Sequence, residues 1–170
     1  MQFRYVHTEE ALTAALKELD AFPKLCLDCE TTGLQATIAK IRLLQLCNAA
    51  PDDENRIIYV LDLFKVKADE RLKQLIESRA MLLAHNTMFD GAILSWRCGI
   101  RPKALADTML MSRALFGTEV SHSLKAVSER YGVGQKGDEV VRALGKRRQD
   151  FDAEDLARYG QYCANDVQLT

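Results

Sequence analysis

The chain has 170 residues and a formal net charge of −1, with 48% hydrophobic and 28% charged residues, which suits one globular domain with a full-sized core. No apolar run approaches the roughly 18 residues of a membrane span, and the first residues lack the basic and apolar regions of a signal peptide. Five scattered cysteines favour reduced thiols over a disulfide framework. We therefore expect a cytoplasmic protein with no membrane partner, and we expect a monomer. The near-neutral charge also lacks the basic footprint of proteins that bind duplex nucleic acid.

Hydrophobic periodicity divides the chain into strands and helices. Short apolar runs predict strands, and apolar residues at helical spacing predict amphipathic helices. The predicted strands cover residues 2–6, 24–30, 39–49, 56–63 and 80–86. The predicted helices cover residues 9–22, 68–78, 87–99, 105–117, 121–132 and 152–170. Strands followed by alternating helix and strand indicate an α/β fold with a mixed central β-sheet flanked by α-helices.

The order of the elements also predicts where functional groups lie. A short polar turn at residues 51–55 separates the third and fourth predicted strands, which we therefore expect to pair antiparallel. In sheets of this kind, functional groups tend to lie at the carboxyl ends of strands. Asp28 and Glu30 lie at such an end, and His85 and Asn86 lie at another.

The stretch KLCLDCETTGL, residues 24–34, interleaves two patterns. Cys26 and Cys29 form C-x-x-C, which occurs in zinc and redox sites, whereas Asp28 and Glu30 form D-x-E. A structural zinc site needs four ligands, and the remaining cysteines and the three histidines form no second close pair. Side chains alternate faces along a strand, so we expect the two cysteines to point to opposite sides as plain buried thiols.

The same alternation places Asp28 and Glu30 on one side of the strand, about 6–7 Å apart along the chain. Two ionised carboxylates side by side at a buried strand end repel each other and lose hydration. A divalent cation such as Mg²⁺ compensates both effects, because it prefers oxygen ligands. Two solvated acids at the entry to a turn would also fit, and this tripeptide alone leaves both interpretations open.

Two later segments carry further acids. In HNTMFDGAIL, residues 85–94, Asp90 falls in the first turn of a predicted helix, where an acid also complements the helix dipole. Asn86 fits either a helix N-cap or a polar group of a site. In YCANDVQ, Tyr162 and Asp166 are four residues apart on one helical face, at the border of the apolar stripe. They form either a solvated surface pair or one side of a cleft.

Taken in this order, LDCETTGL, HNTMFD and YCANDVQLT resemble the three exonuclease motifs of the DEDD superfamily. Tyrosine four residues before the last aspartate is typical of the Tyr subclass, and Gln161 stands where the His subclass has histidine. The similarity is greatest to the 3′–5′ proofreading domain of family A DNA polymerases, the DNA polymerase I type. AKIRLLQL, LADTMLMSRAL and SHSLKAVSERYG extend it from about residue 20 to the end of the chain. It implies a ribonuclease H-like α/β fold with a single exonuclease domain over residues 1–170.

The resemblance implies that two divalent ions, Mg²⁺ or Mn²⁺, are held by Asp28, Glu30, Asp90 and Asp166. Asp28 would bridge the ions, Glu30 and Asp166 would complete the first, and Asp90 would serve the second. Tyr162 would orient the attacking water by a hydrogen bond, because an unperturbed phenol stays protonated at neutral pH and is a poor base. The reaction would release nucleoside 5′-monophosphates from a single-stranded DNA 3′ end, as in proofreading during DNA replication.

The resemblance also implies three substrate contacts. Leu34 would be an apolar wedge against the terminal bases, although a core leucine fits the pattern equally well. The backbone at Thr31 would meet the terminal 3′-hydroxyl, and Asn86 would contact the substrate near the penultimate nucleotide. Lys136, in a glycine-rich loop without the Walker spacing, could reach a phosphate. The basic run Lys146, Arg147 and Arg148 is either a guide for the strand or a solvated face.

Two features depart from the family pattern. Cys29 stands where these polymerases usually have threonine, and we expect little effect because it points away from the acids of the strand. Asp166 is four residues from Thr170, so the chain is either a piece of a bacterial or phage polymerase, with the polymerase domain as its partner, or a free-standing exonuclease. An RNA 3′ exonuclease of the ribonuclease D type and a non-catalytic nucleic-acid-binding module are the rival functions. Modules of the second kind usually lose motif acids, and all four are present here.

Overall fold

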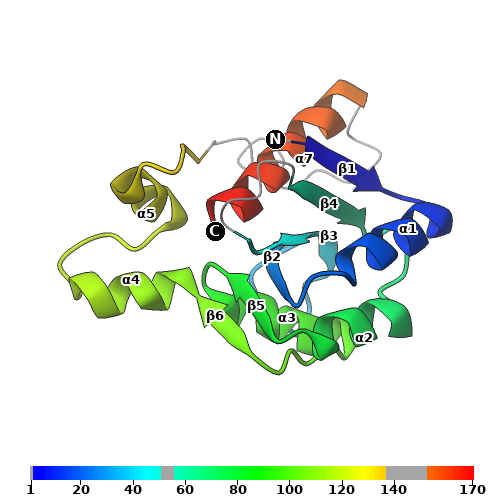
Figure 1. The fold of residues 1–170 in the computed structure, drawn as a ribbon, viewed down its shortest axis with the longest axis horizontal. Helices are drawn as coiled ribbons and strands as arrows, with labels where there is room; N and C mark the ends of the chain where they lie inside the picture. The colour runs from blue at the N-terminus through cyan, green and yellow to red at the C-terminus, as the bar shows by residue number, and fades with distance from the viewer. Residues whose placement is uncertain (1, 51–55, 137–152) are drawn as a thin grey trace.

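The computed structural model describes residues 2–50, 56–136 and 153–170, which form one sheet with helices on both faces (Figure 1). The strands are β1 (Gln2–Val6), β2 (Lys24–Thr31), β3 (Ile41–Asn48), β4 (Ile57–Asp62), β5 (Met81–Ala84) and β6 (Leu105–Asp107). The helices are α1 (Glu9–Leu19), α2 (Glu70–Ser78), α3 (Thr87–Cys98), α4 (Thr108–Phe116), α5 (Leu124–Tyr131) and α7 (Ala153–Leu169). The turn predicted at residues 51–55 lies outside the described residues. Among those described, no helix is both long and apolar enough to cross a bilayer.

The strands form one mixed sheet in the order β1-β4-β3-β2-β5-β6. β1 and β4 are parallel, and β2, β5 and β6 are parallel to one another, whereas β3 runs antiparallel to both of its neighbours. The predicted antiparallel pairing of the third and fourth strands is thus confirmed, with Leu46 opposite Tyr59. Because β2, β5 and β6 are parallel, their carboxyl ends meet at one edge of the sheet, which is where a site is expected.

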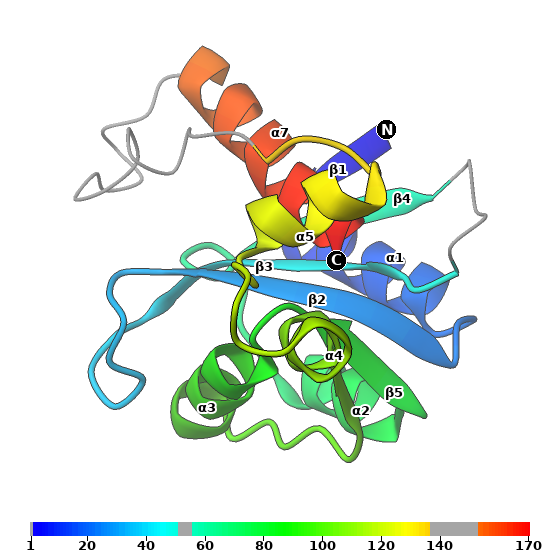
Figure 2. The same cartoon turned by 90° about the vertical axis from the view of Figure 1, so that its left-hand side faces the viewer.

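Successive residues of β2 face opposite sides of the sheet. Figure 2 shows α7 and α5 on one side of the strands and α2 and α3 on the other. Leu25, Leu27 and Cys29 join the larger apolar cluster, which α1, α2 and α3 complete. Cys26 belongs to a smaller cluster beneath α7. Cys26 and Cys29 therefore point to opposite sides as free, buried thiols, as the strand period predicted.

The carboxyl end of β2 carries a register shift and leads into a closed loop. Glu30 pairs with Leu43 but Thr31 pairs with Ile41, so one residue of β3 is skipped. A bulge of this kind turns the chain locally. Thr32 then donates its backbone N–H to Lys40 O at 2.9 Å, and Lys40 N donates to Thr32 Oγ1 at 2.9 Å. These two bonds fix the base of the loop that joins β2 to β3.

Most helix starts follow N-cap chemistry. A side-chain oxygen accepts a backbone N–H of the first turn, which stabilises the start of each helix. The caps of this type are Thr8 of α1, Asp69 of α2, Asp107 of α4 and Ser123 of α5. α3 is different, because Asn86 at its N-cap position has φ 67° and makes no side-chain cap bond. The α3 start must therefore be held by other groups.

The region after α3 differs from its prediction. The helix predicted over residues 105–117 begins three residues later, because Leu105–Asp107 form strand β6, which pairs parallel with β5. Asp107 ends this strand and caps α4. α4 and α5 extend away from the sheet at the left of Figure 1, and α5 lies toward the C-terminal end of α7.

Candidate active site

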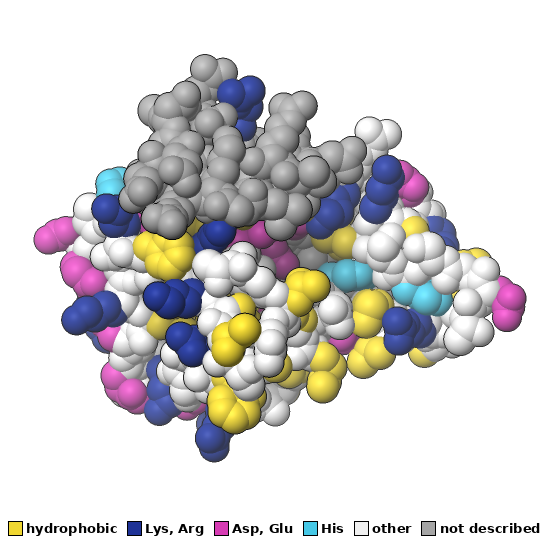
Figure 3. All heavy atoms as spheres, turned by 180° about the vertical axis from the view of Figure 1, so that it is seen from behind, with side chains coloured by type: hydrophobic (Ala, Val, Ile, Leu, Met, Phe, Trp, Pro, Cys, Tyr) yellow, Lys and Arg dark blue, Asp and Glu magenta, His cyan; other side chains and the backbone are white. Residues whose placement is uncertain are grey.

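Three carboxylates meet where the carboxyl end of β2 faces α7. Asp28 and Glu30 lie on the α7 side of β2, and Asp166 projects from α7. One oxygen of each lies within 4.8 Å of the others. Asp166 is 3% exposed, whereas Asp28 and Glu30 are partly exposed. Figure 3 shows acidic side chains in a recess near the middle of one face. The structure thus brings together three of the four predicted acids, which we call the acidic cluster.

Asp90 lies beside the acidic cluster but contacts β2 from its other side. It is in the first turn of α3, is 4% exposed, and lies outside the group of acids within 4.8 Å of one another. Burial raises the pKa of Asp90 to about 8, the charge of Asp28 adds to the rise, and a hydrogen bond with the Cys29 thiol opposes it. Cys29 thus points away from the acids of β2, as predicted, but toward the fourth acid, which the strand period did not indicate.

The acids of β2 are poorly compensated by the protein itself. Burial raises the pKa of Asp28 to about 6, with the charge of Asp166 as the next cause. Burial also raises the pKa of Glu30 to about 8, with the charge of Asp28 as the next cause. A cation nearby would offset both the repulsion and the lost hydration of these carboxylates. The electrostatics therefore favour a cation-binding site.

The ammonium of Lys136 contacts the acidic cluster. Its Nζ forms an ion pair with Asp166 Oδ2, and the Lys136 side chain is 28% exposed. The same ammonium lies 5.4 Å from the centre of the Tyr162 ring. It also opposes the rise in the pKa of Asp28 and of Glu30. The sequence indicated a lysine that could reach a phosphate, and the structure places it on one of the predicted metal ligands.

Two tyrosines of α7 lie against the acids. Tyr162 is 5% exposed and stacks on Tyr159, with ring centroids 6.2 Å apart. Burial, and then the charge of Asp166, raises the pKa of Tyr162 well above its ordinary value. Tyr159 donates its hydroxyl to Glu30 Oε2 at 3.1 Å. The sequence did not predict this contact, because no local pattern links Tyr159 to Glu30. The available signal was the position of Tyr159 three residues before Tyr162 on one helical face.

Asp107 holds the start of α3. Its carboxylate, in a residue 6% exposed, accepts the backbone N–H groups of Asn86 and Thr87 at 3.0 and 2.9 Å and the Thr87 hydroxyl at 2.9 Å. These bonds keep Asn86 in the left-handed region, which asparagine tolerates better than most residues. Asn86 stands at the N-cap position of α3, as one of its two interpretations predicted, but its exposed side chain makes no cap hydrogen bond. Its alternative role as a polar group of the site stays a prediction.

The predicted substrate contacts lie at the same edge of the sheet as the acids. Leu34, in the loop after β2, is 88% exposed, so the core-leucine alternative is wrong. Thr31 is partly exposed and donates its hydroxyl to Gly33 O at 2.7 Å. Contacts of these residues with a substrate stay predictions. The basic run at residues 146–148 lies outside the described residues.

Comparison with known families identifies this arrangement. A family model described as 3′–5′ exonuclease matches residues 3–170. The chain belongs to the 3′–5′ exonuclease family. DNA polymerase I of Aquifex aeolicus (strain VF5) is 42% identical over 127 residues, which are 75% of this exonuclease chain and 20% of that protein. The exonuclease chain therefore spans about a fifth of the length of this relative, and the predicted resemblance to the exonuclease domain of family A DNA polymerases is confirmed.

Solved structures share the fold of the exonuclease at low sequence identity. The complex of Trypanosoma brucei RNase D with GMP has a TM-score of 0.80 at 19% identity, over 99% of the exonuclease chain and 54% of that chain. Brucella melitensis NrnC with bound Mg²⁺ has a TM-score of 0.70 at 19% identity, over 99% and 76% of the two chains. At such identity the likeness shows the fold alone. It confirms the predicted ribonuclease H-like α/β class.

The acids of the exonuclease fit a divalent cation. Asp90 Oδ1 and Asp166 Oδ1 are buried without a hydrogen-bond partner. A buried carboxylate oxygen in this state is costly, and a bound cation would supply the missing interaction. Carboxylate oxygens are the hard ligands that Mg²⁺ and Mn²⁺ prefer. The donor set therefore agrees with the predicted class of cofactor, a divalent metal ion.

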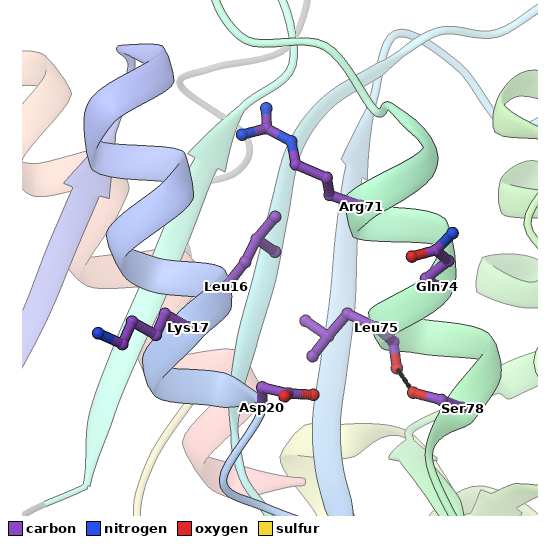
Figure 4. A pocket seen from close by; sticks show the side chains of 7 residues that line it. All are labelled: Leu16, Lys17, Asp20, Arg71, Gln74, Leu75 and Ser78. Atoms are coloured by element: carbon purple, nitrogen blue, oxygen red, sulfur yellow. Dashed lines mark hydrogen bonds between the residues drawn. The ribbon is translucent and has the colours of Figure 1, made fainter.

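A groove away from the acidic cluster is lined in part by charged groups that are already paired within the protein. It lies between α1 and α2 and is lined by Leu16, Lys17, Asp20, Arg71, Gln74, Leu75 and Ser78 (Figure 4). The Arg71 guanidinium is already bound to Asp69 and Glu9, in ion pairs of 2.6 and 2.7 Å. Asp20 is likewise bound to Arg79 at 2.8 Å. Because these charges are satisfied within the protein, the groove presents no cluster of uncompensated groups like that of the acidic cluster.

Proposed function

We propose that this exonuclease removes nucleotides stepwise from the 3′ end of DNA and provides a proofreading activity. The observation that carries the proposal is the acidic cluster, in which oxygens of Asp28, Glu30 and Asp166 lie within 4.8 Å of one another. DNA is favoured as the substrate because the relative at 42% identity is a DNA polymerase I. The likeness to RNase D, at 19% identity, concerns the fold and does not favour RNA.

Two divalent ions, Mg²⁺ or Mn²⁺, are the proposed cofactors. Asp28, Glu30 and Asp166 would hold one ion, and Asp90 would hold the second together with Asp28. Bound ions would supply the positive charge that lowers the pKa of a water and offsets the charge on the phosphate. The raised pKa values of Asp28 and Glu30 support this role, because their ionised forms gain most from a nearby cation.

Tyr162 is proposed to orient the attacking water by donating a hydrogen bond. Its raised pKa keeps the phenol protonated at neutral pH, so it is a donor and not a general base. Stacking against Tyr159 fixes the orientation of the ring. Tyr159 in turn holds the Glu30 carboxylate through its hydroxyl. Tyr162 would therefore position the attacking water, and Tyr159 would position the Glu30 carboxylate.

Leu34, Thr31 and Asn86 are proposed to receive the 3′ end. Leu34, 88% exposed, offers an apolar surface on which terminal bases can pack. Thr31 follows the acids directly, so its backbone is suited to meet the terminal 3′-hydroxyl. The exposed amide of Asn86 carries both a donor and an acceptor, which suits a contact near the penultimate nucleotide.

A DNA polymerase domain is the proposed partner. The segment similar to this chain makes up 20% of Aquifex aeolicus DNA polymerase I, so in that relative it is part of a longer protein. The exonuclease would then act on 3′ ends that leave the polymerase as single strands. Mismatched ends fray more readily than matched ones, so they would reach the acidic cluster more often.

The direct test is degradation of a 5′-labelled single-stranded DNA, with RNA of the same sequence in parallel. Protein with Mg²⁺ should shorten the DNA stepwise from the 3′ end, and EDTA should stop the reaction. Asp28→Ala should lower the rate at least about 10³-fold, because several kcal/mol of charge stabilisation are lost. Asp20→Asn, at the C-cap of α1, is the matched control and should keep the full rate.

Four results would contradict parts of this proposal. No shortening by folded protein would favour the non-catalytic nucleic-acid-binding module, and an equal rate in EDTA would exclude metal-dependent hydrolysis. Faster loss of RNA than of DNA would identify RNA, and not DNA, as the preferred substrate. Proofreading further requires faster removal of a mismatched than of a matched 3′ nucleotide from duplex DNA, and equal rates would exclude it.

A further inference from the structure

Lys136 is a charged residue at the acidic cluster to which the proposed reaction gives no role. It follows α5, and its ammonium pairs with Asp166 Oδ2. Asp166 Oδ1, by contrast, is buried without a hydrogen-bond partner. One oxygen of a proposed metal ligand is therefore bound to a lysine, and the other is left for a further cation.

The segment that carries Lys136 is fixed against α7. The side-chain amide of Asn165 donates to the Gln135 carbonyl at 3.0 Å. Gly134, at φ 144°, approaches α7 so closely that a Cβ there would lie 2.8 Å from Leu169 Cδ2. These contacts hold the backbone immediately before Lys136 against the helix that carries Asp166. The ion pair therefore joins α7 to a segment that is already anchored to it.

An ammonium and a divalent ion compete for the same oxygens. Three carboxylates with oxygens within 4.8 Å repel one another, and one ammonium offsets part of that repulsion. A divalent ion carries twice the charge and binds several oxygens at once. While Lys136 occupies Asp166 Oδ2, that oxygen cannot also complete the coordination of an ion in the same geometry.

We propose that Lys136 is a positioning residue that occupies the cation position beside Asp166 until a divalent ion displaces it. In the metal-free protein its ammonium holds the acid of α7 close to Asp28 and Glu30. The inference rests on the proposed function, because it requires that the acidic cluster binds a divalent ion. It gives Lys136 a role in metal affinity and in keeping the metal-free cluster assembled.

Displacement lowers the apparent affinity for the metal. A site that is competent in only a fraction of the molecules binds its ligand more weakly by that fraction. Without the lysine the apparent metal affinity is no longer reduced, but the metal-free acidic cluster also lacks its compensating positive charge. Removal of Lys136 should therefore tighten metal binding and destabilise the metal-free protein. Loss of a merely structural contact would instead weaken metal binding.

The test is Mn²⁺ binding in the absence of nucleic acid, followed by electron paramagnetic resonance. Lys136→Met should bind Mn²⁺ about tenfold more tightly than the unchanged protein, which corresponds to about 1.4 kcal/mol. Lys125→Met, the same change at an exposed lysine of α5, is the matched control and should leave the affinity unchanged. In EDTA, Lys136→Met should unfold at a lower temperature, and saturating Mn²⁺ should remove the difference.

Equal or weaker Mn²⁺ binding by folded Lys136→Met would overturn the inference. If Lys136→Met does not fold, Lys136→Gln removes the charge with a polar side chain and should give the same tightening. Absence of Mn²⁺ binding by the unchanged protein would overturn both this inference and the proposed metal chemistry. Normal Mn²⁺ binding and DNA degradation, with no gain in either Lys136 variant, would overturn the inference alone.

Discussion

The two sides of β2 are closed in different ways. Leu25 and Leu27 are at most 2% exposed and face an apolar cluster that three helices complete. Asp28 and Glu30 follow these residues along the strand, face α7, and meet Asp166. One strand thus contributes to a dry core on one side and to a group of mutually repelling acids on the other.

Apolar packing on one side of β2 offsets the energetic cost of the buried acids on the other side. Burial of apolar area stabilises the fold by about 25 cal/mol per Å², whereas buried carboxylates without a cation destabilise it. Both effects act on the same backbone, because the side chains of β2 alternate. The apolar side therefore holds Asp28 and Glu30 in positions that their own charges oppose. Substitutions on the two sides should change stability in opposite directions.

The neighbouring residues Leu27 and Asp28 should show the largest difference in the effect of substitution on the free energy of unfolding. Leu27→Ala should lower the free energy of unfolding by about 2–5 kcal/mol, because it leaves a cavity in the core. Asp28→Asn should raise the free energy of unfolding in EDTA, because it removes a charge from a repelling group. Urea unfolding in EDTA measures both. A cost under about 1 kcal/mol for Leu27→Ala, or destabilisation by Asp28→Asn, would show that the two sides do not differ in this way.

Tyr162→Phe separates packing from chemistry on the α7 side. The ring still stacks on Tyr159, so stability should change little, but the proposed hydrogen bond to the attacking water is lost. The rate of DNA degradation should fall about 10- to 100-fold, as expected for one hydrogen bond to an oxygen that gains negative charge as the water attacks. Tyr131→Phe, at a tyrosine of α5 that is 54% exposed, is the matched control. An unchanged rate in Tyr162→Phe would assign the tyrosine to packing alone.

The pH dependence of stability is the smallest effect and tests the acids directly. The pKa of Asp28 is raised to about 6, and the pKa values of Glu30 and Asp90 to about 8, all above the ordinary values near 4. Between about pH 4 and 8 the folded state therefore binds more protons than the unfolded state, so these groups lower stability as the pH rises.

Thermal unfolding in EDTA measures this slope. Between pH 5 and pH 8, Tm should fall by at least about 2 °C more in the unchanged protein than in Glu30→Gln, which corresponds to about 1 kcal/mol for a chain of this size. Saturating Mn²⁺ should abolish the difference between the two proteins. A steeper fall in Glu30→Gln would mean that Glu30 is already ionised and compensated in the metal-free fold.

Local patterns predicted most of the fold, because most elements are long enough to show their own period. The alternation in β2 correctly separated Cys26 from Cys29 and placed Asp28 beside Glu30. β6 was missed because its three residues are too few to show alternation, and they lead directly into the helical pattern of α4.

The contacts between the predicted site residues were less accessible from the sequence. Tyr159 and Glu30 are 129 residues apart, and Lys136 and Asp166 are 30 residues apart on different segments. No local spacing encodes such pairs, because they depend on where α7 crosses the sheet. The order of the three motifs indicated that the acids share a site, but not that a lysine stands among them.

The loop between β2 and β3 is mechanically separated from the strand that precedes it. The register shift after Glu30 ends the regular ladder, and the two bonds between Thr32 and Lys40 close the loop at its base. Extra length in a closed loop costs only about 0.6 kcal/mol for each doubling. The residues around Leu34 can therefore be exchanged or lengthened without rotating Asp28 and Glu30. Evolution or design could therefore change the proposed contact of this loop with a nucleic-acid 3′ end while Asp28 and Glu30 keep their positions on β2.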